Sequence, residues 1–173
     1  MMGAKTQSID SWLKAHATHQ PNHPAVHFEG HTWTYRAFSD WVEQVAVALQ
    51  HSLGLKPGDR VAYYGKNCDT EVALFFACAR LGLIIVPLNW RLVPAELNYI
   101  LGDSGAKVLF HDDNFLDQVP AALDGLATLA VNTSDRLDAL IDKSQGLAVA
   151  TDADLSDPMF IVYTSGTTGR PKG

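Results

Sequence analysis

With 173 residues, of which 47% are hydrophobic, the chain is long enough to form one globular domain with a stable core. Its formal net charge of −6 and its pI near 5.5 argue against a nucleic-acid-binding surface, which is normally basic. Cys68 and Cys78 have no second cysteine pair with which to build a zinc site, and they are typical of a reduced intracellular chain.

Targeting signals are not visible in the sequence. Residues 1–20 lack the apolar core of a secretory signal. The longest apolar stretches, 72–79 and 81–88, are split by Arg80 and are too short to span a bilayer. We therefore expect a cytoplasmic protein without a transmembrane segment and without a nucleic-acid partner.

The N-terminal part of the chain predicts a helix, a hairpin and a second helix. Residues 9–19 have apolar positions at helical spacing. Residues 25–35 alternate apolar and polar side chains on both sides of Glu29-Gly30, which predicts a β-hairpin. The apolar spacing then becomes helical over residues 35–53, and Gly54 is a typical helix end.

Histidines are frequent in this region and recur at intervals of three or four residues: His16, His19, His23, His27 and His31. On one continuous helix, such a row could bind a metal ion. Pro21 and Pro24 interrupt any such helix. We therefore interpret these histidines as scattered surface residues.

The rest of the chain alternates strand and helix patterns after a Pro-Gly turn at 55–59. Strands are predicted at 60–64, 83–88, 107–110, 127–131 and 159–163, helices at 70–83, 94–101, 115–123 and 136–143, and a loop at 144–158. This order is typical of strands joined by right-handed helical crossovers. The predicted fold class is α/β, with a mostly parallel sheet flanked by helices and preceded by an N-terminal β-hairpin.

The last segment, residues 163–173, reads Tyr-Thr-Ser-Gly-Thr-Thr-Gly-Arg-Pro-Lys-Gly. A glycine-rich, hydroxyl-rich loop after a strand can hold a phosphate, because backbone N–H groups and hydroxyls converge on the anion and a lysine adds a positive charge. The segment does not fit the Walker pattern, the G-x-G-x-x-G pattern or the G-x-S-x-G pattern. From composition alone, a flexible connector is an equal alternative.

The order of these residues resembles the signature of the adenylate-forming, AMP-binding superfamily, and most closely that of acyl-CoA synthetases. Other family landmarks follow one another along the chain: 32–35, 55–62, 86–92 and 96–101. One departure is Val93, where the family usually offers Thr or Ser. Loss of that N-cap hydroxyl predicts a helix from 94 to 101 that frays at its start.

The resemblance implies that residues 1–173 are the N-terminal part of the large AMP-binding domain. Within it, we expect a hairpin and helix at 25–54, the α/β sheet at 59–163 and a phosphate-binding loop at 163–173. The implied nucleotide contacts are Thr164, Ser165, Gly166, Thr167, Thr168, Gly169 and Lys172. No catalytic residue and no metal ligand is assigned within the chain.

The implied reaction is that of an acyl-CoA or aryl-CoA ligase. A small carboxylic acid attacks the α-phosphate of ATP with Mg²⁺, pyrophosphate leaves, and the acyl group passes from AMP to coenzyme A. Family members continue past this loop into a second sheet and a C-terminal domain, so we expect this segment to be inactive alone. A non-catalytic nucleotide- or phosphate-binding module and a structural remnant stay as alternatives. The sequence leaves open the acid, the choice between coenzyme A and a carrier-protein thiol, and the oligomeric state, a homodimer included.

Overall fold

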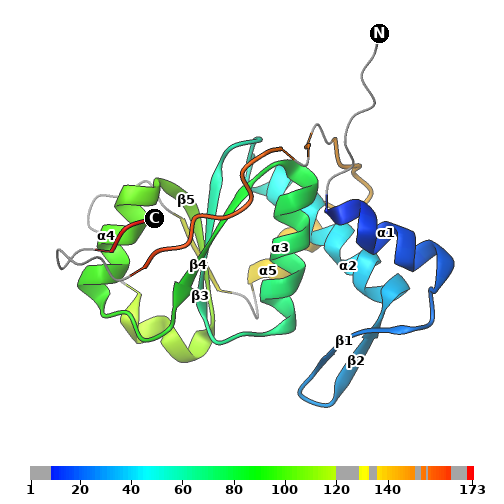
Figure 1. Ribbon diagram of the computed structural model, residues 1–173, viewed down its shortest axis with the longest axis horizontal. Coiled ribbons are helices and arrows are strands. Elements are labelled where there is room, and N and C mark those ends of the chain that lie inside the picture. The colour runs from blue at the N-terminus through cyan, green and yellow to red at the C-terminus, as the bar shows by residue number, and fades with distance from the viewer. Residues whose placement is uncertain (1–8, 120–128, 133–135, 151–152, 155, 165–170) are drawn as a thin grey trace, which may run out of the picture.

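The computed structural model describes residues 9–119, 129–132, 136–150, 153–154, 156–164 and 171–173. Its N-terminal part holds helix α1 (Asp10–His19), strands β1 (Pro24–Phe28) and β2 (His31–Thr34), helix α2 (Tyr35–Val47) and the π-helical turn η1 (Ala48–Ser52) (Figure 1). The sheet region holds strand β3 (Arg60–Gly65), helix α3 (Asp69–Leu81), strand β4 (Ile84–Asn89), helix α4 (Pro94–Ser104) and strand β5 (Ala106–His111). The 3₁₀ turn η2 (Asp113–Gln118), strand β6 (Leu129–Asn132) and helix α5 (Arg136–Lys143) follow.

Four parallel strands form the main sheet, in the order β4-β3-β5-β6. The chain moves from β3 to one neighbour, β4, and then crosses back to the other neighbour, β5. Two crossovers of the same hand place their helices on opposite faces of a sheet when they run in opposite directions along it. Helices α3 and α4 therefore lie on the two sides of the sheet (Figure 1). This confirms the predicted α/β class.

Both faces of the sheet are covered by apolar side chains. Val61, Tyr63 and Phe110 point into one core, which packs against α2, α3 and α5. Tyr64 and Leu109 point into the other core, together with residues from α4 and η2. A strand that alternates between two buried faces is apolar throughout, which is why the strands appear in the sequence as continuous apolar runs.

The antiparallel hairpin of β1 and β2 is confirmed at its predicted turn. Glu29 and Gly30 have φ angles of 46° and 81°, so both central residues adopt the left-handed region that the tightest hairpin turns require. The following helix begins where the Thr34 side chain accepts a hydrogen bond from the N–H of Ala37 at 3.2 Å. The hairpin lies at the opposite end of the molecule from α4 (Figure 1).

Several predicted helices differ from the structure at their ends. The helix expected over 35–53 changes into a π-helical turn from Ala48. The helix expected over 70–83 ends at Leu81, because Gly82 adopts a left-handed φ of +65°. At its start the Cys68 side chain accepts from the Glu71 N–H at 3.4 Å.

Helix α4 is longer than predicted and runs to Ser104. Val93 offers no hydroxyl, but the Glu96 carboxylate accepts a hydrogen bond from the Val93 N–H at 3.1 Å. One half of a capping box is therefore kept, and it satisfies a donor at the helix start. The predicted fraying itself stays a prediction.

Two predicted elements are wrong in type. The helix expected from Phe115 is a short 3₁₀ turn, which begins where Asp112 accepts from the Asn114 N–H at 2.9 Å and ends where the backbone becomes extended at Val119. Residues 120–123 of that prediction lie outside the described residues. The buried strand expected at 159–163 is an extended segment with one bridge to β4, and its Phe160 and Val162 are 48% and 58% exposed.

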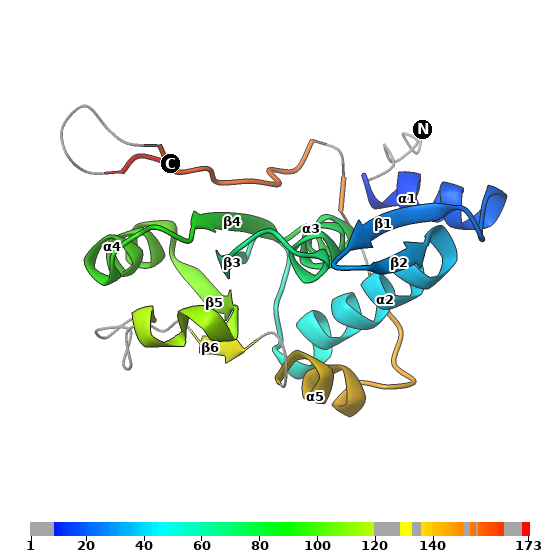
Figure 2. The same ribbon diagram turned by 90° about the horizontal axis from the view of Figure 1, so that it is seen from below.

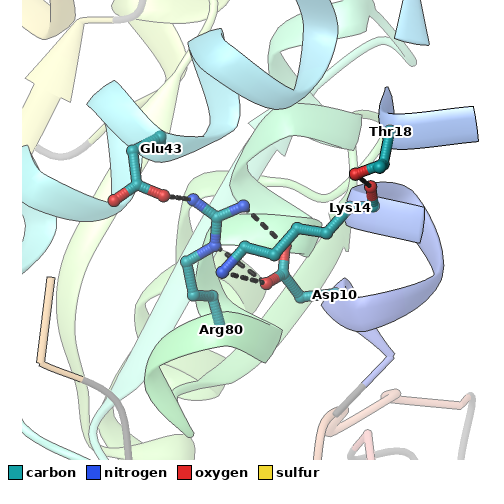
Figure 3. Close-up of polar contacts among 5 residues, drawn as sticks. All are labelled: Asp10, Lys14, Thr18, Glu43 and Arg80. Carbon is teal, nitrogen blue, oxygen red and sulfur yellow. Dashed lines mark hydrogen bonds and ion pairs between the residues drawn. The ribbon is translucent and has the colours of Figure 1, made fainter. Parts of the chain in front are cut away.

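Arg80 joins three helices through a buried ionic cluster, which we call the Arg80 cluster (Figure 3). Its guanidinium is 1% exposed and donates to both oxygens of Asp10 on α1, at 2.9 and 2.8 Å. It also pairs with Glu43 of α2, and Lys14 lies 3.2 Å from the Asp10 carboxylate. The Arg80 cluster therefore fixes α1 and α2 to α3.

Asp59 gives the fold a pH-dependent contact at the amino end of the sheet. Its carboxylate lies 2.8 Å from the Lys107 ammonium and accepts from the Lys56 N–H at 2.9 Å. Burial raises the pKa of Asp59, but these two partners and nearby Arg60 outweigh it, so the pKa lies below its ordinary value. A lowered pKa in the folded state stabilises the protein above the unfolded pKa, and this stability is lost as pH falls through the folded pKa.

Replacing Asp59 with asparagine is therefore expected to lower the free energy of unfolding by about 1.5 kcal/mol at pH 7 and by less near about pH 3. Urea unfolding at both pH values measures the difference. Asp40→Asn, at an exposed position on α2, is the matched control. An equal loss from Asp59→Asn at both pH values would contradict the assignment.

No described helix combines the length and the apolar composition needed to cross a membrane. Among the described residues, no three His, Cys, Asp or Glu side chains gather as a metal-binding group.

Candidate functional site

The segment that leads into the glycine-rich residues lies along the free edge of β4 (Figure 2). The Ile85 N–H donates to the carbonyl of Met159 at 2.9 Å, and the Ile161 N–H donates to the carbonyl of Ile85 at 3.0 Å. The segment therefore runs parallel to β4 and reaches the carboxyl edge of the sheet. In open α/β sheets, ligands bind at that edge.

The two ends of the glycine-rich segment are hydrogen-bonded to each other. The Thr164 N–H donates to the carbonyl of Lys172 at 2.9 Å, and the Lys172 N–H donates back to the carbonyl of Thr164 at 3.0 Å. Of the predicted nucleotide contacts, the structure describes only these two. Ser165, Gly166, Thr167, Thr168 and Gly169 lie outside the described residues. The predicted loop thus leaves and returns at one point, and we call the Thr164–Lys172 pair its base.

A cavity of about 290 Å³ lies beside this base. Its walls include Asn89 after β4, Glu96 at the start of α4, and Tyr163, Thr164 and Pro171 from the terminal segment. Pro87, Leu88, Leu92 and Ile100 supply apolar walls. The cavity therefore combines a few polar groups with apolar walls, as small-molecule sites commonly do.

Tyr163 connects the base of the loop to α4. Its hydroxyl donates to the Asp103 carboxylate at 2.5 Å. Burial, together with this bond, raises the pKa of Tyr163 above its ordinary value, so the phenol keeps its proton and stays a donor. Asp103 was not among the residues predicted from the sequence. An acidic residue in the last turn of a helix, where the dipole disfavours it, is the signal that would have pointed to it.

A second cavity of about 310 Å³ opens at the carboxyl ends of β3 and β4. Its walls include Gly65, Glu71, Asn89 and Arg91. The Arg91 guanidinium lies 4.0 Å from the centre of the Trp90 ring, so it is held by the ring face. Burial raises the pKa of Glu71 above its ordinary value. Gly65 has no room for a side chain, since a Cβ there would lie 2.8 Å from the Tyr63 hydroxyl and 2.9 Å from the Asp112 Cβ.

Comparison with known families identifies the chain. The family described as AMP-binding enzyme matches residues 13–173, which is nearly the whole chain. The chain belongs to this family. This confirms the resemblance to adenylate-forming enzymes that the terminal segment first indicated.

Relatives of this chain include proteins named as a CoA synthase and as an acyl-carrier-protein ligase. The chain is 40% identical over 169 residues to feruloyl-CoA synthase of Amycolatopsis sp, covering 98% of this chain and 33% of that protein. It is 39% identical to the fatty acid–[acyl-carrier-protein] ligase ScoC of Streptomyces coeruleorubidus, covering 96% of this chain and 32% of that one. The chain therefore spans about a third of the length of these relatives.

The fold agrees with a solved member of the family. The inhibitor-bound N-terminal domain of FACL13 from Mycobacterium tuberculosis is similar with a TM-score of 0.83 and 30% sequence identity. The match covers 98% of this chain and 44% of that domain. This chain thus shares the fold of part of that N-terminal domain.

Proposed function

We propose that the protein is an ATP-dependent acyl-CoA or aryl-CoA ligase in which residues 163–173 bind the pyrophosphate leaving group. The observation that carries this proposal is the base of the loop, where Thr164 and Lys172 pair at the carboxyl edge of the sheet with the family's signature between them. We infer that a loop whose two ends are held together can direct its hydroxyls, backbone N–H groups and lysine toward one anion. Such fixed donors stabilise charge without having to reorganise during the reaction.

The reaction divides between this loop and its substrates. The carboxylate of the acid attacks the α-phosphate, and negative charge accumulates on the departing β- and γ-phosphates. The Lys172 ammonium and the hydroxyls of Thr164, Ser165, Thr167 and Thr168 would neutralise and hold that charge. Gly166 and Gly169 would let the backbone approach the phosphates.

Magnesium is expected to enter with the phosphates of the nucleotide, since Mg²⁺ in nucleotide sites is bound largely by phosphate oxygens and water. The thiol that takes the acyl group is proposed to be that of coenzyme A. A carrier-protein thiol is the alternative, because ScoC is named for transfer to an acyl carrier protein.

Pyrophosphate exchange into ATP tests the proposal. The full-length protein is expected to incorporate labelled pyrophosphate into ATP only when a carboxylic acid is present. The acid panel should include ferulate and a fatty acid, which the names of these two relatives suggest. Absence of exchange with every acid would contradict the assignment. Product analysis with coenzyme A and with a carrier protein then identifies the acceptor.

The 173-residue chain alone is expected to bind MgATP but not to catalyse pyrophosphate exchange. Calorimetric titration with MgATP measures binding, and the exchange assay measures turnover. Turnover by this chain would show that the residues required for adenylation lie within it. Binding without any exchange by the full-length protein would favour a non-catalytic phosphate-binding module.

A further inference from the structure

We propose that Asp103 is a positioning residue for the pyrophosphate loop, and that it acts by holding Tyr163 against the two ends of that loop. The contact joins residues that are 60 positions apart, one at the end of α4 and one at the base of the loop. The effect on ATP rests on the proposed function. The structural effect on the loop ends can be measured without it.

The end of α4, which carries Asp103, is fixed to the sheet. The Arg60 guanidinium on β3 donates to the carbonyls of Ser104 and Gly105 at 2.7 and 2.9 Å, which fixes the end of α4 to the sheet. Gly105 ends the helix with a left-handed φ of +61°. The backbone that carries Asp103 is therefore fixed to the sheet, and from there its exposed carboxylate accepts from the hydroxyl of Tyr163.

Tyr163 lies next to both ends of the glycine-rich loop. Tyr163 precedes Thr164, which pairs with Lys172. Its ring also packs against Gly173, where a Cβ would lie only 2.8 Å from the ring atoms Cε2 and Cζ. One ring thus contacts the chain before the loop and after it, and fixing its hydroxyl restrains both ends.

The electrostatics of α4 support a role outside the helix. Asp103 lies in the last turn, which carries no basic residue, and the negative end of the helix dipole disfavours a carboxylate there. The hydroxyl of Tyr163 donates a hydrogen bond to that carboxylate, and hydrogen bonds to a charged acceptor are the stronger kind. The Arg60 guanidinium at the same helix end offsets part of this cost, and the Tyr163 hydroxyl gives the Asp103 carboxylate a hydrogen-bond partner on the terminal segment.

Asp103→Asn and Tyr163→Phe in the full-length protein test the proposal. Both keep the shape of the side chain, and both weaken or remove the hydrogen bond. Each is expected to raise the KM for ATP about tenfold, the scale of one hydrogen bond to a charged group, while the KM for the acid changes little. The double variant should be no worse than Tyr163→Phe, because the two residues act as one contact. Asp103→Glu, which keeps the carboxylate, should recover part of the loss.

Amide hydrogen exchange supplies a readout that does not depend on activity. In the protein without substrate, both variants are expected to speed exchange at the N–H groups of Thr164 and Lys172, while exchange in β3 and β5 stays unchanged. Asp40→Asn on α2 carries the same chemical change at an exposed position and should alter neither readout. Thermal unfolding of each variant checks that the fold is intact.

The two proposals fail differently. If the unsubstituted protein exchanges no pyrophosphate with any acid, the proposed function is wrong, and hydrogen exchange alone decides whether Asp103 restrains the loop ends. If exchange at Thr164 and Lys172 is the same in Asp103→Asn, Tyr163→Phe and the unsubstituted protein, the positioning role is overturned. A general fall in the temperature of unfolding with equal losses in every kinetic constant would also overturn it, because that result describes a structural contact only.

Discussion

Replacement of Arg80 with alanine is expected to lower the free energy of unfolding by about 3–5 kcal/mol, the usual loss when one partner of a buried ion pair is removed. Asp10 is 2% exposed, and its carboxylate receives two hydrogen bonds from the Arg80 guanidinium. Without them, Asp10 keeps only Lys14 as an ionic partner in the Arg80 cluster, and it stays out of reach of most water. Urea unfolding at pH 7, followed by tryptophan fluorescence, measures the change.

Two further variants separate the loss of charge pairing from the loss of packing. Arg80→Met with Asp10→Leu replaces the pair by apolar side chains of similar size, and it should recover most of the stability. Glu43→Gln should lower the free energy of unfolding by less than Asp10→Asn does. The Glu43 side chain is 46% exposed, so water can replace its partner. A loss below about 1 kcal/mol from Arg80→Ala would show that the Arg80 cluster contributes little.

Local patterns in the sequence were enough for most of the fold. The turn at Glu29-Gly30 needs residues that tolerate a positive φ, so the hairpin was visible in the sequence before any tertiary contact was known. The buried strands were visible as apolar runs because both of their faces are covered. Helix α5 has the predicted bounds, since its apolar spacing is set within the helix itself.

Contacts between distant residues could not be read from the sequence. Arg80 and Asp10 are 70 positions apart, and no sequence pattern around either residue predicts their contact. Residues 159–163 have the composition of a buried strand, but composition does not say how many neighbours a strand will find. In the structure the segment has a single bridge to β4, and its outward side chains Phe160 and Val162 are exposed.

Only the local part of the candidate site was predictable from the sequence. The signature at 163–173 gave the family and the expected chemistry, and the comparison with known families confirmed the family. The sequence could not show that Thr164 and Lys172 form a closed base, or that Asp103 reaches Tyr163. Both depend on where α4 and the terminal segment come to lie, which is a property of the whole sheet.

Lys172 provides the sharpest test of the proposed chemistry. Its backbone forms the base of the loop with Thr164, while its side chain is exposed and free of the apolar core. Lys172→Ala therefore keeps the N–H and carbonyl that pair with Thr164 and removes only the ammonium group. We expect a loss of about 100-fold in the rate of pyrophosphate exchange by the full-length protein, which is about 2.7 kcal/mol of transition-state stabilisation.

The kinetic pattern of Lys172→Ala is more informative than the size of the loss in rate. If the ammonium group stabilises the charge that develops as pyrophosphate leaves, kcat should fall while the KM for the acid stays close to its original value. Lys172→Arg keeps the charge in another shape and should lose less. Lys143→Ala, at an exposed position on α5, is the matched control and should leave exchange unchanged. A loss of less than about threefold from Lys172→Ala, against the 100-fold expected of a charge-stabilising donor, would favour the flexible connector that composition alone left open.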